Sequence, residues 1–228
     1  MKNLNGTVKI LKNYSFDVER KLGEWVPIVK PDTPLFTYIT SINYFDRSGD
    51  YIDFLRGKEL YSKSIEIKNG NVIIHKSYDA NGKFEYGFSV NQKNKNEKIY
   101  INLDENMNIT ESTKVIYTFE NNIIKSAITY DKDMNILQKI IYTIMNGKQI
   151  NSVYFFYVDG NEKSRVERKY DKNDNDIYYL HIRNGNKYER YTKYIEYDKN
   201  GNWIESMDFE DKELTKATRM NFREIEYY

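Results

Sequence analysis

The chain has 228 residues, of which 35 are Lys or Arg, 34 are Asp or Glu and none is Cys. Because binding to nucleic-acid phosphates requires a surplus of cations on one face, the net charge of +1 argues against a nucleic-acid partner. The absence of Cys excludes disulfides, thiol nucleophiles and cysteine zinc sites. No stretch approaches the roughly 18 apolar residues of a membrane helix, so we expect no membrane span.

The amino-terminal part of the chain contains no apolar segment of the kind that a secretion signal needs, since residues 1–6 are mostly polar. We therefore expect a cytoplasmic protein, or an extracytoplasmic one at the surface or in the periplasm if a signal has been removed. Residues 7–16 are typical of an opening strand, and residues 17–23 predict one short helical turn. All three prolines follow within residues 27–34, which predicts an edge segment or a loop because central strands reject Pro.

The composition favours strands over helices throughout, with 26 Ile, 22 Tyr and 11 Phe against 3 Ala. From residue 41 onward one turn pattern recurs: an apolar residue, Asp, any residue, a short polar residue, often Gly, and then Asn or another polar residue. Its six copies begin at Phe45, Tyr78, Leu103, Tyr130, Tyr170 and Tyr197, at intervals of 33, 25, 27, 40 and 27 residues. Such a period is typical of a repeat array.

Each copy of this pattern predicts a β-hairpin. The Asp side chain accepts a backbone hydrogen bond two residues on, and the Gly supplies a left-handed residue for a type I turn with a G1 bulge. Three copies carry Met107, Met134 or Asp174 where the Gly is expected. We expect these copies to place a neighbouring Asn in the left-handed conformation or to use another loop length, because positive φ costs a larger residue about 1 kcal/mol.

Shorter turn signals lie between the copies, and several are typical of two-residue type I′ turns. They are Asn69-Gly70, Asn121-Asn122, Asn146-Gly147, Asp159-Gly160, Asn184-Gly185 and Asp211-Lys212. Residues 91–98 are polar throughout and predict a mobile loop. The pattern as a whole predicts one all-β domain over residues 1–228, with an amino-terminal segment (1–40) and a hairpin array (41–228). We expect an extended antiparallel meander of consecutive hairpins, a curved repeat sheet that is open or partly closed, with a two-sheet sandwich as the alternative.

At these turns the chain resembles the YD-repeat (RHS-like) proteins of bacteria, whose units read Tyr-Asp-x-x-Gly-Asn followed by an apolar residue. Residues 197–204 (Tyr-Asp-Lys-Asn-Gly-Asn-Trp-Ile) are the best copy, and the opening is similar to small Bacteroidetes YD-repeat proteins at residues 8–10, 14–16 and 21–24. The likeness covers roughly residues 40 to 215. It implies consecutive hairpins in an extended, often spiralling sheet, in a family whose large members encapsulate toxins or act at surfaces.

No residue earns a catalytic assignment. The two histidines, His75 and His181, each fall in a predicted strand, where a packed or half-exposed side chain is the expected state. Carboxylates are abundant, so a glycosidase pair stays an alternative, yet most Asp residues occupy turn corners that the backbone explains. Residues 171–176 and 198–202 space Asp and Asn oxygens as calcium loops do, without the Gly or Glu of an EF-hand. We expect turn geometry to account for them, and we predict neither metal nor cofactor.

The function that these observations favour is a non-catalytic binding or scaffold role. The 22 Tyr residues and Trp203 predict an aromatic sheet face that recognises a protein or a glycan, through contact residues that the sequence leaves unidentified. The alternative interpretation of the tyrosines is that they only cover the sheet. Two further alternatives are assembly by pairing of exposed strand edges, with the charged run 223–228 as a cap, and a carbohydrate-active hydrolase.

Overall fold

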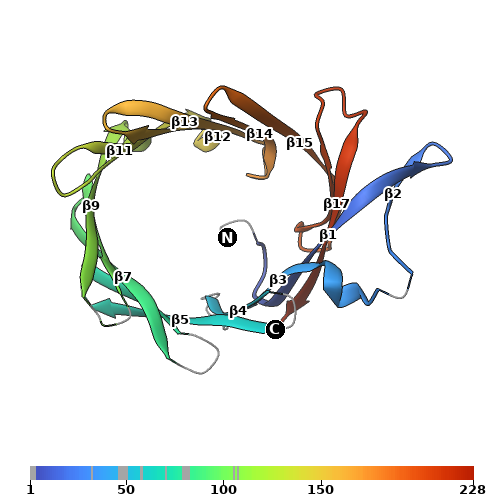
Figure 1. Ribbon diagram of the computed structural model, residues 1–228, viewed down its shortest axis with the longest axis horizontal. Helices are drawn as coiled ribbons and strands as arrows, with labels where there is room; N and C mark the ends of the chain where they lie inside the picture. Colours follow the sequence, from blue (N-terminus) through green and yellow to red (C-terminus); the bar gives the residue numbers. More distant parts are fainter. Residues whose placement is uncertain are drawn as a thin grey trace. The chain divides into compact units, whose positions relative to one another are not determined.

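The computed structural model describes residues 4–31, 33–45, 51–56, 59–69, 71–78, 83–104, 106 and 108–228. Its strands are β1 (Val8–Lys21), β2 (Glu24–Pro27), β3 (Ile39–Phe45), β4 (Tyr51–Arg56), β5 (Glu59–Asn69), β6 (Val72–Tyr78), β7 (Phe84–Asn94), β8 (Glu97–Leu103), β9 (Ile109–Glu120), β10 (Ile123–Tyr130), β11 (Ile136–Met145), β12 (Lys148–Val158), β13 (Asn161–Tyr170), β14 (Asp176–Arg183), β15 (Asn186–Tyr197), β16 (Trp203–Phe209) and β17 (Ala217–Tyr227). The only helix in these ranges is a short 3-10 helix, η1 (Leu35–Tyr38), and no described helix is long and apolar enough to cross a membrane. The predicted all-β class and antiparallel meander are confirmed (Figure 1).

Contacts divide the chain into two compact units. Unit 1 comprises Met1–Ser64, Asp79–Lys83 and Arg190–Tyr228, and unit 2 comprises Ile65–Tyr78 and Phe84–Glu189. The chain passes from one unit to the other within β5 and within β15, so each unit is built mainly from consecutive hairpins. The prediction of one domain over the whole chain stays a prediction.

Unit 1 joins strands from the two ends of the sequence. β1 pairs antiparallel with β17 along one edge and with β3 along the other, and Figure 1 shows blue β1 beside red β17. The ion pairs Lys9–Glu226 (2.6 Å) and Lys12–Glu224 (3.0 Å) bridge the β1–β17 ladder. The charged run 223–228, predicted as a cap, therefore covers no free edge, because residues 223–227 pair with β1.

The predicted helical turn at residues 17–23 is wrong. β1 continues to Lys21, and Leu22 and Gly23 form a tight turn with φ of 52° and 92° into β2. Gly23 lowers the strain of this turn because it adopts positive φ without a steric penalty, and the exposed Leu22 precedes it. The predicted edge or loop around the prolines is confirmed: Pro27 ends the four-residue strand β2, opposite Val18, and the remaining prolines lie between β2 and η1.

The buried apolar side chains of unit 1 form two clusters, one of which comprises Val8, Leu11 and Phe45. Met207, Phe209 and Met220 form a buried cluster against which Trp25 of β2 packs. This cluster anchors the β1–β2 hairpin to the carboxyl-terminal strands. Because β2 is held against this cluster, the segment that follows β2 lies beside the carboxyl-terminal half of β1. The backbone N–H of Ile28 donates there to the carbonyl of Asp17 (2.7 Å).

Unit 2 is a succession of long hairpins. Among the two-residue turns whose central residues are both described, Asp211-Lys212 has no positive φ, whereas the other four have positive φ at both residues, as type I′ turns require. They are Asn121-Asn122, Asn146-Gly147, Asp159-Gly160 and Asn184-Gly185. The predicted loop at residues 91–98 is wrong: β7 runs to Asn94 and β8 begins at Glu97, because ladder hydrogen bonds organise a polar strand as well as an apolar one.

The repeated turn also has the predicted bulge. In every copy the first residue pairs with the residue six positions ahead, and the register shifts at that pair. The pairs are Phe45–Tyr51, Tyr78–Phe84, Leu103–Ile109, Tyr130–Ile136, Tyr170–Asp176 and Tyr197–Trp203. Residues 46–50, 70, 79–82, 105 and 107, which include several of the predicted turn interiors, lie outside the described residues.

The expectation for the copies without Gly is wrong in the two that the structure describes at that position. Met134 and Asp174 themselves adopt the left-handed conformation, with φ of 66° and 63°, at the position where Gly201 has φ of 80°. The loop length is unchanged, since the N–H of residue two in each copy still donates to the carbonyl four residues on (Asp131 to Asn135, 3.0 Å). The hydrogen bonds that the Asp side chain accepts offset the strain at the left-handed residue three positions later.

Candidate functional site

The turn carboxylates that the calcium hypothesis singled out are engaged by the chain itself. One oxygen of Asp171 accepts hydrogen bonds from the N–H groups of Asn173 (2.8 Å) and Asn175 (2.9 Å), and the other accepts from the Asn175 side chain (3.0 Å). Asp131 makes the same three bonds. Hydrogen bonds from the Asn135 side chain and backbone hold the pKa of Asp131 below its usual value.

The turn at Asp198 is additionally tied to both ends of unit 1. Tyr227 donates a short hydrogen bond to Asp198, and the buried Asn202 side chain donates to the Tyr227 hydroxyl (2.7 Å) and to the carbonyl of Asn5 (2.8 Å). Burial alone would raise the pKa of Asp198, but the hydrogen bonds from Tyr227 and from the backbone outweigh it and lower the pKa. These oxygens serve the turn, and no group of three or more His, Asp or Glu side chains among the described residues is arranged around a common metal position.

The two histidines are held in strands, as expected, and far apart in the strand order of unit 2. His75 of β6 stacks on Phe88 of β7 with ring centroids 4.3 Å apart. His181 of β14 lies opposite Val166, and its ring packs edge-on with that of Tyr179, with ring centroids 6.4 Å apart. The structure does not bring these side chains together.

Trp203, which the sequence suggested as a ligand-contacting residue, is packed within unit 1. The guanidinium carbon of Arg223 lies 3.4 Å from the centre of its ring, and the Tyr194 ring lies 5.4 Å away. Arg223 also donates from Nε to the Asn13 side chain (3.1 Å). Burial lowers the pKa of Arg223 to about 10, which is the cost of holding a cation in this stack. Trp203 is therefore a structural partner of Arg223.

Five tyrosines gather on one face of unit 2, and we call this surface the tyrosine face. They are Tyr100, Tyr117, Tyr142, Tyr154 and Tyr170, from β8, β9, β11, β12 and β13. The register places them together: Ala127 of β10 pairs with Tyr117 on one side and Ile140 on the other, and Ile140 pairs with Tyr154. Residues two apart share a face, so Tyr142 joins this row.

Small residues form the floor beneath these rings. Ser152 is fully buried and Ala127 is 2% exposed, although both sit on a face whose larger side chains are half-buried. Ser152 lies opposite Tyr142 and shares a hydrogen bond of 3.1 Å with the Tyr170 hydroxyl. The tyrosine rings thus cover the sheet while their outer parts remain accessible.

Three tyrosines of this face, Tyr117, Tyr142 and Tyr170, have a raised pKa and stay protonated across the physiological range. Burial raises the pKa of Tyr142 to about 12, and the nearby Tyr154 adds to the shift. Burial and a hydrogen bond to Tyr100 also raise the pKa of Tyr117, and burial raises that of Tyr170. The face therefore presents neutral hydroxyl groups that donate and accept hydrogen bonds, set in apolar rings.

Cations border this surface. Lys98 of β8 places its ammonium 5.6 Å from the centre of the Tyr117 ring. Arg168 of β13, on the same face as Ser152 and its strand neighbours, lies over Tyr179 at 5.2 Å and pairs with Asp176 at 3.1 Å. Sequence alone did not identify these residues. The alternation of faces along each strand places Tyr142, Ser152 and Arg168 on one face, but only when the positions of the β-bulges are known.

The described side chains of the tyrosine face are thus aromatic rings with hydroxyl groups, bordered by the cations Lys98 and Arg168.

Family models and curated sequences give no match to this chain. Solved structures do: a porin-like protein from Bacteroides uniformis is similar in fold, with a TM-score of 0.53 at 9% identity, covering 98% of this chain and 99% of that one. A porin-like protein from Bacteroides vulgatus aligns over 99% of both chains at 10% identity, with a TM-score of 0.44. At such identities the first likeness is one of fold. The resemblance to YD-repeat proteins rests on the turn motif.

Proposed function

We propose that this protein is a non-catalytic binding protein that recognises a protein or glycan through the tyrosine face. The observation that carries the proposal is the convergence of five tyrosines from five strands over a floor of small residues, Ala127 and Ser152. Tyrosine offers a large contact area, few rotatable bonds and a hydroxyl that bonds sugar hydroxyls or peptide groups. The raised pKa values of Tyr117, Tyr142 and Tyr170 keep their hydroxyls neutral, so these groups can both donate and accept hydrogen bonds.

The face is also prepared for binding before a ligand arrives. Tyr170 is held by Ser152, and Tyr117 is held by Tyr100, so part of the rotamer entropy that binding would otherwise remove is already lost in the folded protein. The bordering Lys98 and Arg168 are engaged with aromatic rings, which leaves the centre of the surface to the tyrosines.

The test combines a glycan array with capture from envelope and lysate fractions read by mass spectrometry. The double variant Tyr142→Phe/Tyr154→Phe removes two hydroxyls from the face and keeps the rings. The matched control is Tyr178→Phe, which removes a hydroxyl from the opposite face, where Tyr178 pairs with Lys169 and bonds Glu189 (2.9 Å). The proposal expects binding that the control retains and the double variant loses at unchanged stability. Binding that survives the double variant, or no binding to either library, overturns it.

The fold likeness favours a second candidate, the passage of a solute across a membrane, because the similar protein from Bacteroides uniformis is described as porin-like. The charges of unit 2 rank this candidate lower. Arg168 lies on the tyrosine face, and Lys139 and Arg165 share the cross-strand row through Phe155 on the opposite face. A Lys or Arg facing lipid at mid-membrane costs about 2–4 kcal/mol. Ion conductance across a planar bilayer, measured with the purified protein, distinguishes the two candidates.

A further inference from the structure

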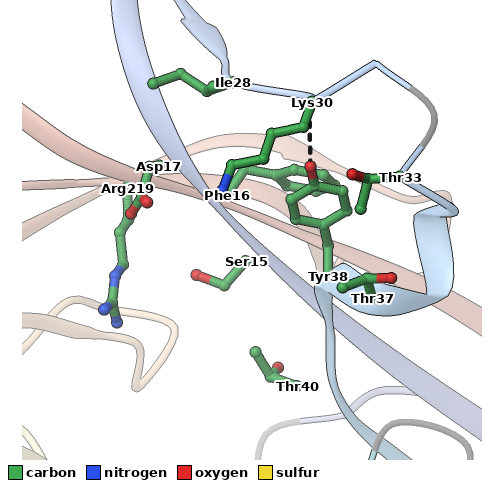
Figure 2. A pocket seen from close by; sticks show the side chains of 10 residues that line it. All are labelled: Ser15, Phe16, Asp17, Ile28, Lys30, Thr33, Thr37, Tyr38, Thr40 and Arg219. Atoms are coloured by element: carbon green, nitrogen blue, oxygen red, sulfur yellow. Dashed lines mark hydrogen bonds between the residues drawn. The ribbon is translucent and has the colours of Figure 1, made fainter.

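A cavity of about 550 Å³ lies in unit 1, between β1, the segment that follows β2, η1 and β17 (Figure 2). Its walls are Ser15, Phe16, Asp17, Ile28, Lys30, Thr33, Thr37, Tyr38, Thr40 and Arg219. This volume is in the range of sites that hold small molecules, roughly 300–1,000 Å³. The lining is mostly hydroxyl-bearing and charged, with two cations and one carboxylate, so the cavity suits a small polar ligand that carries negative charge.

The aromatic wall of the cavity is rigid. The Tyr38 ring stacks on Phe16 with centroids 4.6 Å apart, and Phe16 in turn packs edge-on against Phe222 at 5.6 Å. The Tyr38 hydroxyl accepts a hydrogen bond from the backbone N–H of Lys30 (2.9 Å), which Figure 2 shows as a dashed line. This bond fixes the loop that carries Lys30 relative to η1. The site therefore exists without a ligand.

The charged groups are not satisfied by one another. Asp17 and Arg219 are cross-strand partners in the β1–β17 ladder, yet Figure 2 shows the Arg219 side chain extending away from the Asp17 carboxylate. Within the part of the chain that the structure describes, neither residue makes an ion pair, and Lys30 makes none either. In the same ladder the equivalent pair Lys12–Glu224 closes at 3.0 Å.

The hydroxyl groups divide into two kinds. Ser15 donates to the Asn221 side chain (2.9 Å) and Thr40 donates to the carbonyl of Asn13 (3.2 Å), so these two serve the protein. The hydroxyls of Thr33 and Thr37 have no hydrogen-bond partner among the described residues. They remain available to a ligand that itself carries hydroxyl groups.

We propose that this cavity binds a sugar acid, a small carbohydrate with a carboxylate group. Arg219 and Lys30 take the carboxylate, because a guanidinium matches its geometry and an ammonium supplies a second charge. Thr33, Thr37 and Asp17 bond the ring hydroxyls, and Asp17 accepts only, so it selects a hydroxyl donor and repels a second anionic group. The site is separate from the tyrosine face and does not depend on the function proposed for that surface.

The experiment is calorimetric titration of the purified protein with glucuronate, with glucose as the neutral counterpart and inorganic phosphate as a plain anion. We expect glucuronate to bind at least roughly tenfold more tightly than glucose, since charge-assisted hydrogen bonds to the carboxylate are lost in the neutral sugar. The variants Arg219→Gln and Lys30→Gln each weaken glucuronate binding by a similar factor. Both side chains are exposed, so neither change threatens the fold.

The matched control is Arg20→Gln, which removes an exposed cation of β1 that is not part of the cavity wall, and it leaves glucuronate affinity unchanged. Four results overturn the proposal: absence of glucuronate binding, equal affinity for glucose, equal affinity for phosphate, or retention of full affinity in Arg219→Gln and Lys30→Gln. Equal phosphate binding would identify a general anion site and remove the sugar from the assignment.

Discussion

Replacing Met134 by Gly should stabilise the protein, although it removes a large side chain. Met134 holds φ of 66° at the fourth position after Tyr130, and its side chain is 53% exposed. Its backbone N–H donates to the Asp131 carbonyl (3.2 Å), a bond that Gly keeps, as Gly201 does to Asp198 (3.0 Å). The substitution therefore changes the conformational strain and little else.

The magnitude follows from two opposing effects. The left-handed conformation costs a residue with a β-carbon about 1–2 kcal/mol, and Gly removes this cost. Gly also gives the unfolded chain more freedom, which lowers stability by about 0.4–1 kcal/mol. The midpoints leave a net stabilisation of about 0.8 kcal/mol. For a chain of this length, this amount raises the melting temperature by roughly 2–3 °C.

Guanidinium and thermal unfolding followed by circular dichroism measure this change. The control is Lys132→Gly in the same turn, where the residue is exposed and φ is not positive. This variant has no strain to lose, so we expect it to be destabilised by about 0.4–1 kcal/mol. The reasoning fails if Met134→Gly is no more stable than Lys132→Gly, because the positive φ would then carry no strain.

Three further predictions concern groups described above. Asp198 has a lowered pKa, so its stabilising bonds are complete above its ordinary value of 3.8 and are lost as the pH falls through the lower folded value. The free energy of unfolding, measured from pH 7 to pH 2, should therefore fall more steeply below pH 4 for the wild type than for Asp198→Asn. Calcium should leave the melting temperature unchanged, because the Asp171 oxygens already accept hydrogen bonds from the chain, and a concentration-dependent rise would contradict this. Ser152→Ala should lower the free energy of unfolding by about 1 kcal/mol by removing the partner of Tyr170, and in a Tyr170→Phe background the same change should cost clearly less.

Local structure was largely predictable from the sequence because its determinants are local. The Asp and Gly of residues 197–202 define a turn with one bulge, and the structure has that bulge at Tyr197. Met134 shows where a residue preference is overruled, since the three hydrogen bonds to Asp131 impose the turn on whatever residue follows. Polar residues 91–98 form a hairpin for a related reason, because backbone pairing does not require apolar side chains.

The candidate sites were only partly predictable. A tyrosine-rich face follows from composition, but its members depend on how strands are aligned, and each bulge, such as those at Tyr130 and Tyr170, changes which residues become neighbours. The cavity was not predictable, because it requires β17 to lie beside β1. That pairing brings Arg219 opposite Asp17 and depends on no local pattern in either segment.

The pairing of β1 with β17 also constrains the order in which the protein can be made. Lys9 and Glu226 bond across a separation of 217 residues, so β1 leaves the ribosome long before its partner strand is translated. Unit 2 consists of neighbouring hairpins and can form as the nascent chain emerges, whereas one edge of β1 must wait. An unpaired strand edge is a template for aggregation, so synthesis of this protein places its greatest demand on chaperones at the amino-terminal strand.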